Sequence, residues 1–90
     1  MGSHDEAVLQ WNVVEFVKDV VRLGTTASIS HDLVPGGSAT ADEAVKQGLV
    51  VITTKKETLN TYQLTFQGLM LYWSHADTSE VFLISRKVAN

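Results

Sequence analysis

Two pairs of a histidine and a nearby carboxylate are the residues of this chain best suited to acid–base or metal chemistry. His31 directly precedes Asp32, and His75 lies two residues before Asp77. An imidazole that titrates near neutral pH and a neighbouring carboxylate could share a proton or hold a cation. Both pairs stand in turn-like stretches, where aspartate commonly caps the backbone and histidine is merely solvated. We therefore favour the interpretation that neither pair forms a functional site.

The serine and glycine motifs of catalysis and phosphate binding are incomplete. Ser28, Ser30 and Ser38 lack the glycine-flanked elbow that presents a nucleophile. Gly36 and Gly37 lack the lysine and the helix start that a phosphate-binding loop needs. The chain contains no cysteine, so thiolate metal sites and disulfides are excluded. We expect a protein that is not an enzyme and that needs no metal and no small-molecule cofactor.

Length and composition predict one globular domain. The 90 residues are 44% hydrophobic and 19% charged, which separates the chain from disordered sequences. Residues 1–4 resemble a vector-derived start, so the domain is expected to occupy residues 5–90. No stretch approaches the roughly 18 consecutive apolar residues of a membrane span, and the N-terminus lacks a secretion signal. Together with the absence of cysteine, this predicts a cytoplasmic protein that does not contact membranes.

The charge balance bears on which partners the chain can bind. The formal net charge is −3, from seven lysines and arginines against ten acidic residues. Binding to nucleic acid depends on basic side chains that displace counterions from phosphates. The adjacent basic pairs are Lys55-Lys56 and Arg86-Lys87. Such pairs more often form solvated strand ends than a nucleic-acid surface.

The N-terminal third predicts an amphipathic helix. From Glu6 to Leu23 apolar residues recur at helical spacing, with Asp5 available as an N-cap and Gly24 just past the end. Trp11 falls among the charged residues of this helix. It either lies over the lysine and arginine stems or marks a contact surface for another molecule.

A polar connection and a short helix are expected to follow. The segment Thr25 to Thr40 is rich in serine, threonine and glycine and holds the single proline. It predicts a long loop with one helical turn at Ser28 to Leu33. The segment Thr40 to Gly48 predicts a short helix that is capped by Thr40, carries acids in its first turn and stops at the glycine.

The remaining sequence is rich in strand-forming residues. An apolar run from Leu49 to Thr54 and an alternating segment from Thr61 to Phe66 predict a hairpin whose tip is Lys55 to Asn60. Leu69 to Trp73 and Val81 to Ile84 are further apolar runs that could pair as a second hairpin.

Part of this segment resembles a known family. The order Gly48-Leu49-Val50, a basic hairpin tip and then Tyr62-Gln63-Leu64-Thr65-Phe66-Gln67-Gly68 resembles the wing of winged-helix (winged helix-turn-helix) proteins. In those families Gly-Leu-Val closes the recognition helix, the hairpin forms the wing, and Leu-Thr-x-x-Gly opens a following helix. The resemblance implies that Thr40 to Gln47 is the recognition helix and that Lys55 to Asn60 is the wing tip.

The segment Phe66 to Ser74 separates two architectures. As a helix, it completes an α+β domain with an N-terminal amphipathic helix, short helices and an antiparallel hairpin, in a winged-helix-like order. As a strand, it produces one long helix packed on a four-stranded antiparallel meander. Propensity favours the strand, because Phe66, Gly68 and Trp73 are poor helix formers.

Each architecture suggests its own function. A winged-helix-like regulator of transcription would bind DNA through Lys46, Gln47, Lys55 and Lys56, although Asp42 and Glu43 of the same expected helix repel phosphates. Its partner could equally be a protein. The alternative is a protein-interaction or oligomerisation module, such as a homodimer, that uses an apolar β-sheet surface and binds no nucleic acid. The contact residues expected for a protein interface are Trp11, Tyr72, Trp73 and Phe82.

Overall fold

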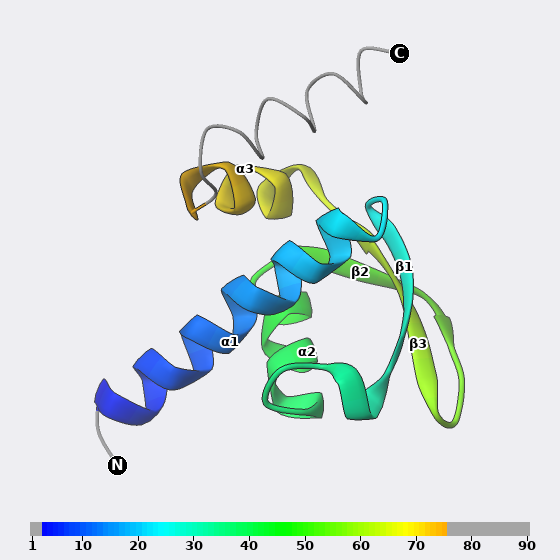
Figure 1. Ribbon diagram of the computed structural model, residues 1–90, viewed down its shortest axis with the longest axis horizontal. Helices are drawn as coiled ribbons and strands as arrows, with labels where there is room; N and C mark the ends of the chain where they lie inside the picture. Colours follow the sequence, from blue (N-terminus) through cyan, green and yellow to red (C-terminus); the bar gives the residue numbers. More distant parts are fainter. Residues whose placement is uncertain (1–2, 76–90) are drawn as a thin grey trace.

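Residues 3–75 fold into three α-helices, one short 3-10 helix and a three-stranded antiparallel sheet, which confirms the α+β class (Figure 1). The computed structural model describes residues 3–75, with side chains from residue 6 onward. The elements in chain order are α1 (Ser3–Arg22), β1 (Thr26–Ser30), the 3-10 helix η1 (His31–Leu33), α2 (Ser38–Lys46), β2 (Val50–Lys55), β3 (Leu59–Leu64) and α3 (Phe66–His75).

The sheet has the strand order β1-β3-β2, so β3 is central and β1 and β2 are the edges. Ile29 of β1 faces Asn60 of β3, and Val50 of β2 faces Leu64. A β-bulge interrupts β2 between Ile52 and Thr54. One face of the sheet packs against the helices. The other face carries mainly hydroxyl and amide side chains, among them Thr26, Ser28, Thr54, Thr61 and Gln63.

The core lies between α1, α2 and the inner face of the sheet. Val13, Phe16, Val17 and Val20 of α1 are fully buried, at the spacing of one helix face. The Phe16 ring meets the Tyr62 ring of β3 edge-on, with centroids 4.9 Å apart. Aromatic pairs in this arrangement add about 0.5–1.5 kcal/mol to the energy of burial. The apolar periodicity of the sequence therefore predicted the correct face of α1.

Glycines end both α1 and α2 in the same way. Gly24 and Gly48 have positive φ angles of 104° and 75°. In each helix the amide after the glycine donates to the carbonyl five residues earlier, at 3.0 Å. This Schellman arrangement satisfies carbonyls that the helix leaves unpaired. The glycine stops that the sequence predicted for both helices are present.

Thr65 and Gly68 explain the Leu-Thr-x-x-Gly pattern. The Thr65 hydroxyl accepts a 3.0 Å hydrogen bond from the Gly68 amide and donates one of 2.5 Å to the Gly48 carbonyl oxygen. A Cβ atom at Gly68 would overlap the Leu49 carbonyl oxygen. Threonine thus caps α3, and glycine lets the helix backbone pack directly on the end of α2.

The expectation of a second hairpin is wrong. Leu69 to Trp73 lies inside α3, so the four-stranded meander is excluded as well. Val81 to Ile84 lies outside the described residues. The capped and closely packed first turn of α3 overrides the strand propensity of its aromatic residues.

The prediction of a long loop from Thr25 to Thr40 is also wrong in part, because this segment contains β1. Ala27 and Ile29 are buried while Thr26 and Ser28 are exposed, which is the alternation of an edge strand with one face on the core. The predicted helical turn is confined to η1, after the strand ends.

Helix α2 begins two residues earlier than predicted. Its N-cap is Gly37 and makes no side-chain cap bond, whereas Thr40 lies inside the helix and is fully buried. Asp42 and Glu43 consequently fall beyond the first turn. Helix α1 begins at Ser3, within the stretch that the sequence assigned to a vector-derived start. Within residues 3–75 no helix has the length and apolar character needed to cross a membrane.

Candidate interaction surfaces

Helix α3 exposes an apolar stripe. Phe66, Met70 and Trp73 are 74%, 50% and 39% exposed, and their spacing places them on one side of the helix. We call these three residues the α3 stripe. Gly68 and Tyr72, on the opposite side, are buried. Helix α3 packs on α1 (Figure 1).

The α3 stripe is unusual because the exposed side of its helix carries three large apolar side chains, while the exposed polar residues of the helix are Gln67, Ser74 and His75. Phe66 to Ser74 contains no charged residue. A helix on the surface of a globular protein normally turns charged or polar side chains to water, and one that is apolar all round is normally buried. Two aromatic rings and a methionine are the residue types enriched at protein interfaces.

The residues predicted for a protein interface lie in different surroundings. Trp73 belongs to the α3 stripe, and Trp11 is exposed on α1. Tyr72 is instead a core residue, which corrects its expected place at a contact surface. Its position on the inner side of α3 follows once the segment is a helix. Phe82 lies outside the described residues.

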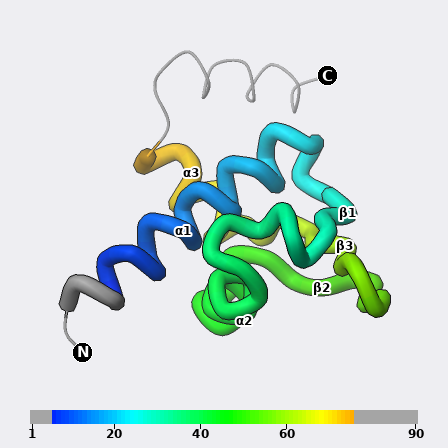
Figure 2. The backbone as a smooth tube through the Cα atoms, turned by 60° about the horizontal axis from the view of Figure 1, so that its bottom comes forward, coloured from blue at the N-terminus to red at the C-terminus, as the bar shows by residue number. Residues whose placement is uncertain are grey.

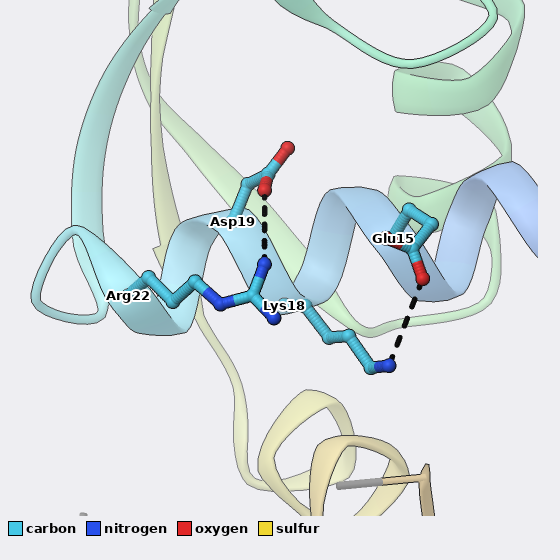
Figure 3. Close-up of polar contacts among 4 residues, drawn as sticks. All are labelled: Glu15, Lys18, Asp19 and Arg22. Atoms are coloured by element: carbon cyan, nitrogen blue, oxygen red, sulfur yellow. Dashed lines mark ion pairs between the residues drawn. The ribbon is translucent and has the colours of Figure 1, made fainter. Parts of the chain in front are cut away.

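Trp11 borders a groove between α1 and the end of α3. The groove holds about 540 Å³, and Val14, Lys18 and His75 are among its lining residues. Lys18 and Glu15 form an ion pair of 3.6 Å at this site (Figure 3). The side chains of both are partly exposed, so the pair contributes little to stability.

The residues predicted to contact DNA form two separate groups. Lys46 and Gln47 lie at the end of α2, while Lys55 and Lys56 lie at the hairpin tip. Strand β2 runs between the groups and spans about 20 Å. Figure 2 shows the hairpin tip projecting away from α2. The fold therefore does not gather these four residues into one basic patch.

Neighbouring side chains reduce the capacity of both groups to bind DNA phosphates. The Gln47 amide nitrogen donates to Gln10 at 3.0 Å and to Glu43 at 2.8 Å, so its amide is engaged within the domain. Asp42 and Glu43 share α2 with Lys46, and Glu57 follows the two lysines of the hairpin tip. Acids at these positions offset the local positive charge that phosphate binding requires.

Of the two histidine–carboxylate pairs, the described residues include only His31 and Asp32 in full. His31 is partly buried at the end of β1, where its backbone amide donates to the Thr58 carbonyl oxygen at 3.0 Å. His75 is exposed at the end of α3, and Asp77 lies outside the described residues. Across the part of the chain that the structure describes, no three His, Asp or Glu side chains come together as metal ligands.

The free edge of β1 is a surface that the sequence did not predict. A groove of about 340 Å³ runs beside it, lined by residues of α1, β1 and η1. Leu23 and Leu33, which are 61% and 72% exposed, are among these residues. The alternation of small apolar and hydroxyl residues from Thr26 to Ser30 was the available signal for this strand.

Asp19 and Arg22 stand at the rim of this β1 groove. Burial raises the pKa of the Asp19 carboxyl above its usual value of 3.8. The Arg22 guanidinium, 3.6 Å away, acts in the opposite direction, and Glu15 adds to the increase (Figure 3). The rim is therefore charged, whereas the leucines beside it are apolar.

No protein family, curated protein or solved structure matches this chain.

Proposed function

We propose that this chain is a non-enzymatic interaction domain with a winged-helix-like arrangement, and that a partner protein covers the α3 stripe. The observation that carries this proposal is the exposure of Phe66, Met70 and Trp73 in a stretch, Phe66 to Ser74, that contains no charged residue. Contiguous apolar surface of this kind marks interaction sites on soluble proteins.

The order of elements around the hairpin supports the winged-helix-like arrangement. Helix α2 ends at Lys46, Gly48-Leu49-Val50 leads into the hairpin β2–β3, and Thr65 caps the next helix. These are the features that the resemblance implied for the closing recognition helix, the wing and the following helix. The same arrangement can serve a protein partner as well as DNA, because function resides in the surface and not in the fold.

The apolar surface in this proposal lies on helix α3, whereas the sequence suggested an apolar surface on the β-sheet. The outer sheet face carries Ser28, Thr61 and Gln63, and Ser28 and Thr61 share a hydrogen bond of 2.8 Å between their hydroxyls. Such a face is well solvated. Burying one large apolar side chain contributes about 1.5–3 kcal/mol, whereas association costs at least about 4 kcal/mol. The three side chains of the α3 stripe together can therefore offset the lower bound of this cost and anchor the partner, and surrounding contacts add to the affinity.

Site-specific photo-crosslinking tests this proposal in the cells that make the protein. A photoreactive residue at position 70 should give a covalent adduct with one protein, and the matched control at Gln63 on the outer sheet face should not. The purified partner should then bind the unmodified chain and bind Met70→Glu at least about tenfold more weakly, a difference of 1.4 kcal/mol. Equal adducts from positions 70 and 63 would overturn the proposal.

A second candidate function is DNA binding through the hairpin tip, where Lys55 and Lys56 are both exposed. Fluorescence anisotropy with duplex DNA at low salt measures it directly. Binding that weakens with salt and is lost in the double variant Lys55→Glu, Lys56→Glu would favour this candidate. Absence of binding at low salt would remove it. A cytoplasmic location remains part of the proposal and rests on the absence of cysteine.

A further inference from the structure

The two edges of the sheet differ in how they are protected. Strand β2 has a bulge between Ile52 and Thr54 and ends at Lys55, and bulges and lysines are devices that keep an edge strand from pairing. Strand β1 has the sequence Thr-Ala-Ser-Ile-Ser, with no charge and no proline, and it pairs with β3 without a register shift. Only β1, among the described strands, is thus an unprotected edge.

The backbone groups of β1 that face outward can be identified. At the two ends of the ladder, the Thr25 carbonyl accepts from the Leu64 amide at 2.7 Å and the His31 amide donates to Thr58 at 3.0 Å. Since hydrogen-bonded residues alternate along an antiparallel pair, the odd-numbered residues of β1 bond to β3. The amides and carbonyls of Thr26, Ser28 and Ser30 therefore point to the free edge.

We propose that β1 pairs antiparallel with β1 of a second copy, so that one sheet runs across both copies. This goes beyond the proposed binding of a partner on α3. A two-fold axis beside Ser28 makes the strand self-complementary: Ser28 faces Ser28, and Thr26 faces Ser30. These are the residues with outward backbone groups, so each facing pair forms two hydrogen bonds.

Side chains match across this axis on both faces. Ala27 faces Ile29 of the second copy on the buried side, so a small residue meets a large one. The outward side brings hydroxyls together, and cross-strand Thr and Ser pairs stabilise sheets. The chain carries a net charge of −3, but no charged residue lies within β1. Pairing of the two strands therefore brings no like charges into contact.

The exposed leucines fit the same two-fold axis. Leu23 stands five residues before Ser28 and Leu33 stands five residues after it. The axis therefore brings Leu23 of one copy to the end of the strand where Leu33 of the other copy lies. Both leucines line the β1 groove, so the contact covers the apolar surface beside the strand.

Charges at the ends of β1 are also complementary. Arg22 ends α1 before the strand, where it pairs with Asp19 of its own copy, and Asp32 follows the strand in η1, so antiparallel pairing brings a basic residue of one copy and an acidic residue of the other to the same end of the contact. Opposite charges at the rim of an interface favour the correct register and speed association.

Charge substitution at Ser28 tests this two-fold contact. The unmodified chain should sediment as a dimer, while Ser28→Glu and Ser28→Lys alone should each raise the dimer dissociation constant at least about tenfold. Mixing these two variants should restore the dimer, because opposite charges then meet at the axis. Gln63→Glu, on the same sheet face of the central strand, is the matched control and should stay dimeric.

Cysteine crosslinking supplies an independent measurement, since the natural chain has no cysteine. Ser28→Cys should form a covalent dimer under mild oxidation, because facing residues of a hydrogen-bonded pair have Cα atoms about 5.5 Å apart. Thr53→Cys on the other edge strand should form none. A monomeric unmodified chain at millimolar concentration, or a Ser28→Glu variant that dimerises as well as the unmodified chain, would overturn the proposal. Met70→Glu should leave the dimer intact, which separates this contact from partner binding on α3.

Discussion

The Thr65 hydroxyl donates a 2.5 Å hydrogen bond to the Gly48 carbonyl oxygen, and so links the first turn of α3 to the end of α2. The same hydroxyl caps α3 through the Gly68 amide. Replacing Thr65 with alanine removes both bonds and should lower the free energy of unfolding by about 1–2 kcal/mol. Urea denaturation measures the change. Thr65→Ser keeps the hydroxyl and should lose much less, so equal losses in both variants would contradict this role.

Gly68 is predicted to tolerate no side chain. Alanine normally favours a helix over glycine by about 1 kcal/mol, but at Gly68 its Cβ would overlap the Leu49 carbonyl oxygen. Gly68→Ala should therefore reduce the free energy of unfolding by about 1–3 kcal/mol, which is typical of overpacking. Ser74→Ala, an exposed position of the same helix, is the control and should be nearly neutral. A stabilised Gly68→Ala variant would mean that α3 does not approach Leu49 this closely.

A substitution in the α3 stripe should change the exposed apolar surface without changing the stability of the fold. Met70→Glu places a charge on a half-exposed position, so the free energy of unfolding should change by less than about 0.5 kcal/mol. Binding of a fluorescent apolar dye should fall, because the stripe loses its central side chain. Gln63→Glu adds the same charge elsewhere and should leave dye binding unchanged. Undiminished dye fluorescence in Met70→Glu would show that the dye binds another surface.

Asp19 should make stability depend on pH in an uncommon direction. Its pKa is raised in the folded chain, mainly by burial, so the folded state binds this proton more tightly than the unfolded state. Stability should then fall as the pH rises from the unfolded value of 3.8 through the higher folded value. In Asp19→Asn this contribution is absent. As the pH rises through that window, the unmodified chain should lose stability relative to Asp19→Asn. If the difference in unfolding free energy between the unmodified chain and Asp19→Asn stays constant with pH, the raised pKa of Asp19 is refuted.

Local sequence patterns were sufficient for α1 and for the β2–β3 hairpin. The buried face of α1 follows from apolar spacing, and the hairpin follows from two β-rich runs separated by a polar tip. The short alternation from Thr26 to Ser30 was only a weak signal for strand β1, because the stability of the strand comes from pairing with distant residues: Ile29 faces Asn60. Its serines and threonines are equally common in loops.

The candidate surfaces depended on the correct assignment of α3. Phe66, Tyr72 and Trp73 favour strands as isolated residues, whereas the Thr65 cap and the close packing at Gly68 select the helix. With a helix, the spacing of residues 66, 70 and 73 separates the exposed stripe from buried Tyr72. With a strand, Tyr72 and Trp73 would have pointed to opposite faces.

The junction at Gly48 and Leu49 also has a consequence for local unfolding. The Leu49 amide bonds to α2, its carbonyl accepts from the Thr65 amide at 3.1 Å, and β2 begins at the next residue. A fluctuation that opens α3 must therefore disturb the end of α2 and the start of β2. The amides of Leu49, Thr65 and Leu69 should exchange their hydrogens with solvent at a common opening free energy, as members of one cooperative unit.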